Sequence, residues 1–156
     1  MRKGEQEMEK GQKKSASLKI EHVCIAVRDR KKAMERFSAV LGTSFSRVFD
    51  VVFPDGIVHG RRKEYEGKLA FCEAGGMEIE LIEPGKGPSI WREFLRAKGE
   101  GVHHIGAFVS DLSEELARFE KMGIGVLQRG EDEHVKFAFM DTESMIGVIL
   151  EILERK

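Results

Sequence analysis

Two histidines and two glutamates stand at matching places in the two halves of this chain. His22 lies in the apolar segment IEHVCIAV and His104 in VHHIGAFV, while Glu80 lies in MEIELIEP and Glu151 in GVILEILE. An unpaired carboxylate in an apolar strand carries a desolvation cost of several kcal/mol. Two imidazoles and two carboxylates instead suit a divalent ion such as Zn, Ni, Co or Mn. These four residues therefore predict one metal site that keeps coordination positions open for water or substrate.

The faces on which these side chains lie are predicted by the alternation of side chains along a strand. Every second residue from 20 to 26 is expected on the face of His22, and every second residue from 102 to 108 on the face of His104. His103 is then expected on the opposite face from His104, where it would pack or support the ligand.

Other polar residues are closer to ordinary surface positions. Glu78 precedes Glu80 by two residues and shares its face, so it is an alternative ligand. His59 and His134 are expected in loops, without a partner that the sequence identifies. The run Arg61-Arg62-Lys63 is a solvated loop or, alternatively, a clamp for the phosphate of an anionic substrate.

The elements that must position the metal site follow from apolar periodicity and from turn residues. Pro54-Asp55-Gly56 and Gly75-Gly76 are turn signals, and Gly42 and Gly123 end helices. The predicted helices are 30–41, 90–98 and 111–122, and the predicted strands are 18–27, 68–74, 77–83, 102–109, 126–129, 135–140 and 146–153.

The two halves of the chain are copies of one unit. The offset is 104 − 22 = 82 at the histidines and 119 − 37 = 82 at the phenylalanines of the matching helices. A repeat of this length indicates a duplicated unit. We expect an α+β fold of two βαβββ modules, 18–84 and 102–156, joined by a linker with a short helix over 85–101. Together they would form a cupped, incomplete mixed β-barrel with flanking helices, preceded by a disordered extension over 1–17.

Composition excludes several classes of partner. Hydrophobic residues make up 41% of the chain, charged residues 34%, and the formal net charge is -1. A balanced globular composition gives no reason to expect a nucleic-acid or membrane partner. Cys24 and Cys72 are far apart and outside any CxxC pair, which indicates reduced thiols and a cytoplasmic location.

The segments around the four candidate ligands resemble the vicinal oxygen chelate superfamily, the group of glyoxalase I and methylmalonyl-CoA epimerase. The resemblance spans residues 19–153 and rests on IEHVCIAV, MEIELIEP, GEGVHHI, FMDT and GVILE. In that superfamily the metal ligands sit where His22, Glu80, His104 and Glu151 stand here. The resemblance implies a metal-dependent enzyme with Co, Ni, Mn or Zn, a small-molecule substrate and a homodimeric assembly.

The segment GEGVHH, preceded by SIWREFL, is similar to the epimerase branch. It implies an isomerase that shuttles a proton at the carbon next to a thioester carbonyl, with an acyl-CoA substrate and with Glu151 and Glu80 as the bases. Epimerases often have Gln at the position of Glu80, whereas glyoxalase I has Glu, so a glyoxalase I-like lactoylglutathione lyase is an alternative. A non-catalytic protein that binds a small ligand is a third interpretation.

Overall fold

The computed structural model describes residues 17–156, so the extension predicted over 1–17 lies outside the described residues apart from Ser17. The helices are α1 (Arg30–Leu41), α2 (Ile90–Lys98), α3 (Leu112–Lys121) and α4 (Glu143–Ile146). The strands are β1 (Ile20–Ala26), β2 (Phe45–Phe53), β3 (Ile57–Val58), β4 (Arg61–Arg62), β5 (Tyr65–Ala74), β6 (Met77–Pro84), β7 (Gly101–Phe108), β8 (Val126–Glu131), β9 (Val135–Met140) and β10 (Ile149–Arg155).

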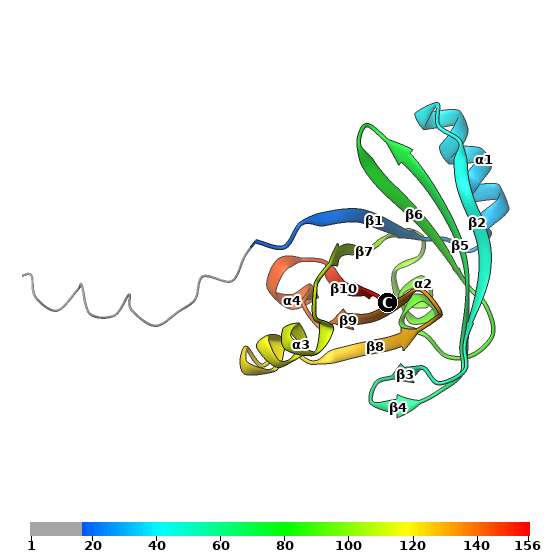
Figure 1. The fold of residues 1–156 in the computed structure, drawn as a ribbon. Helices are drawn as coiled ribbons and strands as arrows, with labels where there is room; N and C mark the ends of the chain where they lie inside the picture. The colour runs from blue at the N-terminus through cyan, green and yellow to red at the C-terminus, as the bar shows by residue number, and fades with distance from the viewer. Residues whose placement is uncertain (1–16) are drawn as a thin grey trace, which may run out of the picture.

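The sheet confirms the α+β fold and repeats one strand order twice (Figure 1). The first half runs β2-β5-β6-β1 and the second runs β7-β10-β9-β8. In each half the first strand pairs in parallel with the last, as β1 does with β6 and β7 with β10. The antiparallel pair β1–β7 joins the halves at the centre. The metal-ligand candidates therefore lie on the four central strands.

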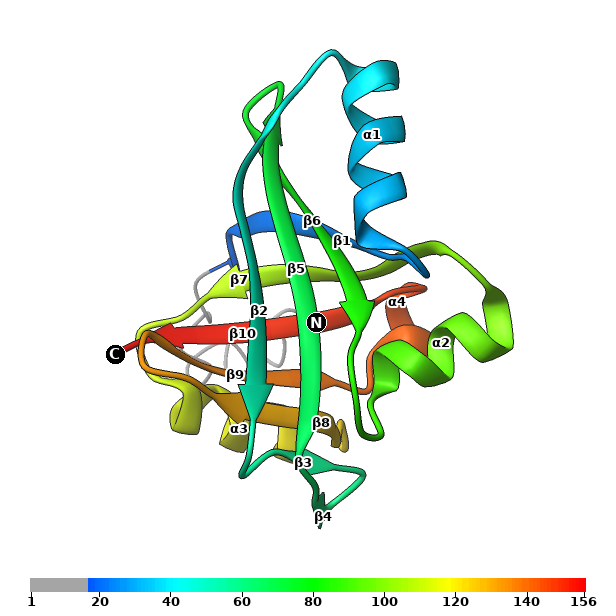
Figure 2. The same cartoon turned by 90° about the vertical axis from the view of Figure 1, so that its right-hand side faces the viewer.

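The sheet curls into an open half-barrel (Figure 2). Strand β2 forms one end of the strand order, yet β3 follows it after the turn at 54–56 and pairs with β8 in the other half. A chain this short can connect the two ends only if the sheet bends around a hollow. The short hairpin β3–β4 thus spans the gap between the two modules.

Capping residues set the ends of helices α1 and α3. Asp29 and Asp111, equivalent in the repeat, cap α1 and α3 by accepting hydrogen bonds from the backbone N–H groups of Lys32 and Glu114. Gly42 ends α1 in the left-handed conformation. Both helices pack on the outer face of the sheet, over separate apolar clusters. Within residues 17–156 no helix is long and apolar enough to cross a membrane.

The concave face carries the main core. Phe53, Tyr65, Trp91, Phe137 and Phe139 are buried there, with ring centroids of neighbouring pairs 5.0 to 5.9 Å apart. Such tilted and edge-to-face contacts stabilise a core beyond the area it buries. These packed rings hold in place the strands whose side chains face the hollow.

Strands β2, β3 and β4 were not among the predicted strands, and two predicted strands start three residues away from their observed first residue. The strand predicted over 68–74 begins at Tyr65, because β2 extends the ladder of β5 to the Phe53–Tyr65 pair. The strand predicted over 146–153 begins at Ile149, because residues 143–146 form α4 and Gly147 then takes a φ of 80°. A residue at positive φ breaks an extended strand.

Two β-bulges overturn part of the predicted alternation. Glu21 is an extra residue on β1, and His103 is an extra residue on β7. A bulge turns side chains out of strict alternation. The prediction that His103 lies opposite His104 is wrong, because both rings pack against Phe139 on the concave side. Ile20, predicted on the face of His22, packs into the core cluster under α3.

Candidate metal centre

The structure brings the four predicted ligands together at the centre of the sheet. In the strand register Glu80 lies beside Cys24, two residues beyond His22, and Glu151 lies beside Gly106, two residues beyond His104. The same geometry therefore occurs once in each module. All four side chains are buried, and each offers one donor atom within 4.8 Å of the others.

The distances between these donors fit one divalent ion. The Nε2 atoms of His22 and His104 are 3.3 Å apart. Each lies 3.0 to 3.1 Å from Oε2 of Glu151 and 3.4 Å from Oε2 of Glu80. Two donors bound to one ion at about 2.1 Å stand about 3.0 Å apart at an octahedral angle and about 3.4 Å apart at a tetrahedral one. The donor set and its spacing thus suit Zn, Ni, Co or Mn.

Gly106 makes room for the His22 ring. A Cβ atom at position 106 would lie 1.9 Å from Cε1 and 2.3 Å from Nε2 of His22, far inside contact distance. The imidazole therefore lies against bare backbone. Because the equivalent residue in the first module is Cys24, the two histidines have different surroundings.

Charge interactions couple the four side chains of the candidate site to one another. Burial lowers the pKa of His22, but the carboxylates of Glu151 and Glu80 outweigh it and the net shift is upward. Burial also opposes charge on His104, yet Cys24 and Glu151 raise its pKa well above the usual value. Burial favours protonation of Glu151, but the histidines lower its pKa to about 2. The imidazoles and the carboxylates thus stabilise each other's charged forms, and a divalent ion would neutralise the carboxylates in the same way.

His103 stands directly behind His104. Its Nδ1 atom lies 2.8 Å from Nδ1 of His104, and its side chain is buried. Burial and the neighbouring His104 lower the pKa of His103 to about 3, so the ring is neutral. The ring packs edge-on against Phe94 of α2 and Phe139.

The remaining polar candidates do not join the cluster. Glu78 faces the same hollow but pairs with Arg47 at 2.8 Å. His59 pairs with Glu93 of α2 at 2.9 Å, outside the hollow. The run 61–63 is exposed and does not line the cavity, so the phosphate clamp has no support there.

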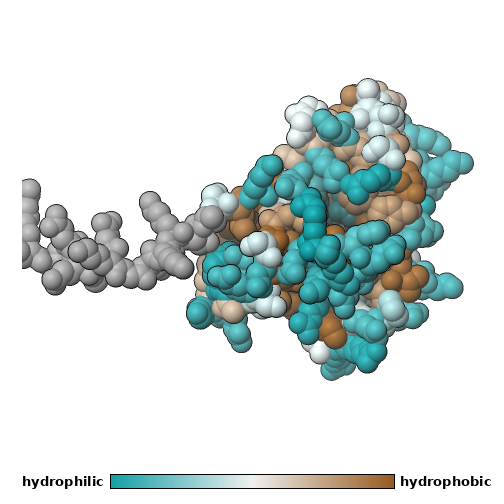
Figure 3. All heavy atoms as spheres, in the orientation of Figure 1, coloured by the Kyte–Doolittle hydropathy of each residue, from teal (hydrophilic) through white to brown (hydrophobic). Residues whose placement is uncertain are grey.

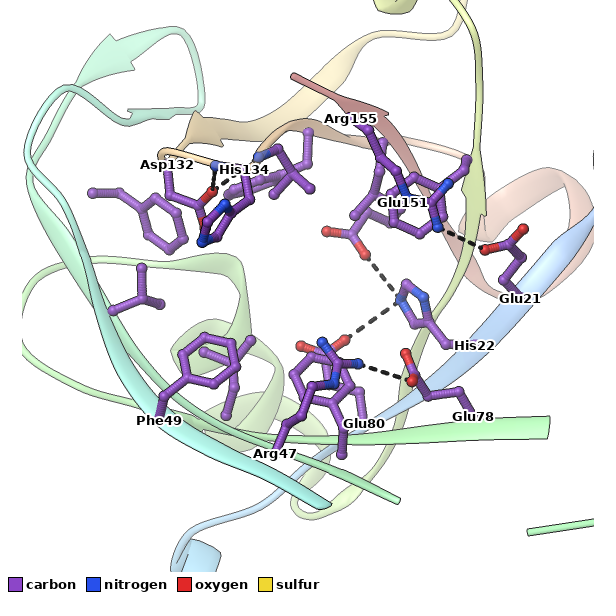
Figure 4. A pocket seen from close by; sticks show the side chains of 18 of the residues that line it. Glu21, His22, Arg47, Phe49, Glu78, Glu80, Asp132, His134, Glu151 and Arg155 are labelled. Atoms are coloured by element: carbon purple, nitrogen blue, oxygen red, sulfur yellow. Dashed lines mark hydrogen bonds and ion pairs between the residues drawn. The ribbon is translucent and has the colours of Figure 1, made fainter. Parts of the chain in front are cut away.

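A cavity of about 710 Å³ opens above His22, Glu80 and Glu151, three of the four predicted ligands (Figure 4). Its walls are largely apolar and come from both modules: Phe49, Val51, Phe53, Leu69 and Phe71 from the first, and Phe108, Val135, Phe137, Phe139 and Leu153 from the second. Volume and lining are those of a small-molecule site.

Charged side chains form the rim of this cavity. Arg47 stacks on Phe71 at 4.0 Å, and Arg155 stacks on Phe108 at 3.6 Å. Arg155 also pairs with Glu21 at 3.5 Å. Sequence reasoning missed these arginines. The available signal was the alternation of Arg47 with pocket residues at 49, 51 and 53, hidden because Val48 and Val52 between them are apolar too.

Comparisons with known proteins agree with this architecture. A family model described as the Glyoxalase/Bleomycin resistance protein/Dioxygenase superfamily matches residues 21–139. The uncharacterized protein YqjC of Bacillus subtilis is 30% identical over 141 residues, which cover 88% of this chain and 93% of YqjC.

Solved structures of methylmalonyl-CoA epimerases share the fold. The Mycobacterium tuberculosis enzyme has a TM-score of 0.69 at 22% identity, covering 91% of this chain and 92% of that one. A Streptomyces coelicolor epimerase variant, in complex with 2-nitronate-propionyl-CoA, has a TM-score of 0.66 at 25% identity, covering 88% of this chain and 95% of that one. With its duplicated modules and with the family match over most of its length, the chain belongs to the glyoxalase/bleomycin resistance protein/dioxygenase superfamily.

Proposed function

We propose that this protein is a metal-dependent isomerase that moves a proton at the carbon next to a thioester carbonyl, as methylmalonyl-CoA epimerase does. The observation that carries this proposal is the pair of buried carboxylates, Glu80 and Glu151, which approach the two histidines from opposite modules at the floor of one cavity (Figure 4). Likeness to epimerase structures supports the choice of reaction.

The four ligands would hold the ion. A bound divalent ion would polarise the substrate carbonyl and so increase the acidity of the proton on the neighbouring carbon. An epimerase must remove the proton from one face of that carbon and return one to the other face. Glu151 on β10 and Glu80 on β6 offer one carboxylate on each side. We assign Glu151 as ligand and as one base, and Glu80 as ligand and as the second.

The cavity suits the acyl end of such a substrate. Its aromatic and aliphatic walls exclude water from the reacting carbon, which strengthens electrostatic interactions there. Arg47 and Arg155 at the rim would have to exchange their partners Glu78 and Glu21 for the phosphates of an anionic substrate such as an acyl-CoA thioester.

A second candidate function is a glyoxalase I-like lactoylglutathione lyase. The observation that favours it is Glu80 itself, a carboxylate at the position where epimerases often carry Gln. The same metal site and the same pair of bases would serve proton transfer in a glutathione hemithioacetal.

Solvent-deuterium exchange separates these functions. The metal-loaded protein is incubated in D₂O with methylmalonyl-CoA and, separately, with the glutathione hemithioacetal of methylglyoxal, and label at the α-carbon is followed by mass spectrometry. We expect label in methylmalonyl-CoA. Label in the hemithioacetal product alone would establish the lyase, and label in neither would leave a ligand-binding protein.

The variant Glu151→Gln tests the assignment of the base. Gln keeps the shape and one oxygen donor but removes the proton acceptor. We expect the variant to retain much of its metal and to lose about 10²- to 10⁴-fold in exchange rate, the usual contribution of a positioned base. Exchange near the parent rate with metal retained would restrict Glu151 to a ligand role.

A further inference from the structure

We propose that His103 is a positioning residue that fixes which nitrogen of His104 carries the proton, and thereby sets the affinity of the site for a divalent ion. This inference rests on the metal site of the proposed function, and it extends that site to a residue beyond the four ligands. It is tested by metal binding, independently of any enzymatic activity.

The contact between the two rings requires one donor and one acceptor. The Nδ1 atoms of His103 and His104 are 2.8 Å apart, within hydrogen-bond distance. A neutral imidazole has one N–H and one lone pair, so only one of these two nitrogens can carry a proton in this contact. The contact therefore couples the tautomer of one ring to that of the other.

Only one of the two coupled arrangements leaves a ligand. The Nε2 atom of His104 faces His22 and the two glutamates, so it is the atom that would bind the ion. Its lone pair is free only if the proton of His104 sits on Nδ1 and is donated to Nδ1 of His103. The reverse arrangement places a proton on Nε2 of His104 and blocks the site.

The surroundings of His103 hold the acceptor in place. The ring is 1% exposed and lies between Phe94 and Phe139, with centroids 5.1 and 5.9 Å away. In the required tautomer its own proton sits on Nε2, which has no hydrogen-bond partner within residues 17–156. A donor at Nε2 would favour the opposite tautomer, and the described residues place none there.

The β-bulge supplies this contact, and the repeat shows that it is particular to the second module. His103 is the extra residue on β7, which turns it to the concave side together with His104. The equivalent extra residue on β1, Glu21, turns to Arg155 at the rim instead. Within the described residues His22 has no hydrogen bond at Nδ1, so His104 is the more firmly oriented ligand.

Two substitutions separate hydrogen bonding from packing. His103→Phe keeps an aromatic ring between Phe94 and Phe139 but removes the acceptor, whereas His103→Asn loses the ring but retains an acceptor oxygen. Dissociation constants for Zn²⁺ are measured by competition with a chromogenic chelator. We expect the constant to rise about 10- to 100-fold in His103→Phe, the usual cost of losing a ligand's hydrogen-bond partner, and to stay within about threefold of the parent in His103→Asn.

Cys24 provides the competing explanation and the matched control, because it lies opposite His104 in the pairing of β1 with β7. Cys24→Ala should leave the Zn²⁺ affinity unchanged. The inference is overturned by parent-like affinity in His103→Phe, by equal losses in His103→Phe and His103→Asn, or by a loss confined to Cys24→Ala.

The parent protein gives a second test that needs no variant. Long-range ¹H–¹⁵N spectra of the Zn²⁺-loaded protein report the tautomer of each histidine. We expect a proton on Nδ1 of His104 and on Nε2 of His103. A proton on Nδ1 of His103, or a parent that binds no divalent ion, would overturn the inference. Absence of isomerase activity with metal binding intact would count against the proposed function alone.

Discussion

Substituting Gly106 by Ala tests the metal site through a residue that offers no ligand. The added Cβ would lie 1.9 Å from the His22 ring, while ordinary contact begins at 3.4 Å, so the ring must move by 3.4 − 1.9 = 1.5 Å. The strand cannot move away instead, because residue 106 is paired with β1 on one side and with β10 on the other. The strain therefore falls on the ligand.

A shift of this size removes His22 from coordination. Site geometry must be held to about 0.5 Å for productive binding, and the shift is about three times that. We expect the Zn²⁺ dissociation constant to rise on the order of 100-fold or more, beyond the range for disturbing a ligand's support alone. Overpacking should also cost the metal-free protein about 1–3 kcal/mol.

Gly101→Ala is the matched control on the same strand, because a Cβ there meets nothing within 4 Å. Chelator competition gives the affinities, and thermal unfolding of the metal-free proteins shows that both variants fold. If Gly106→Ala folds and binds Zn²⁺ like the control, His22 is not a ligand and the assignment of the centre is wrong.

Three further predictions concern the same site and the assembly. His104→Ala should abolish divalent-ion binding, checked by elemental analysis after dialysis; retention of one ion per chain would contradict it. The pKa values of His22 and His104 are raised in the folded protein, so protonation of these rings stabilises the fold without metal. This stabilisation is fully present below pH 6.5, the unperturbed pKa of histidine, and is lost as the pH rises through the pKa values of the folded state. Metal binding must displace those protons, so the increase in melting temperature caused by Zn²⁺ should grow between pH 6 and pH 8, and a pH-independent increase would refute it. A homodimer is expected because β2 is an edge strand that exposes Val48 and Val52. Apolar groups also interrupt the mostly hydrophilic face seen in Figure 3. A monomer at micromolar concentration in light scattering would disprove the dimer.

The four clustered residues could be predicted because the sequence repeat places each of them at the same position as a residue of the same type in the other module. A lone histidine in a strand carries little information, but His22 and His104 recur in register, and so do Glu80 and Glu151. Helices α1, α2 and α3 were predicted to within a residue because the capping residues Asp29, Ser89 and Asp111 mark their starts, whereas the single turn of α4 was not predicted.

The bulges could not be predicted because they depend on pairing between distant strands. No feature of the segment VHH shows that His103 lacks a pairing partner on β1. Strict alternation of side chains then assigns His103 to the wrong face of the sheet. The pairing of β3 with β8 has the same origin, since two residues at 57 and 58 carry no strand period of their own.

The pairing of β1 with β7 determines when the site can exist during synthesis. The first module alone contributes His22 and Glu80, and two donors hold a divalent ion far less firmly than four. His104 joins them once β7 has docked on β1, and Glu151 joins only after the chain has grown past residue 151 and β10 has paired with β7. An ion bound by all four donors would therefore be captured late, after the two modules have joined, and it could not guide the earlier steps of folding.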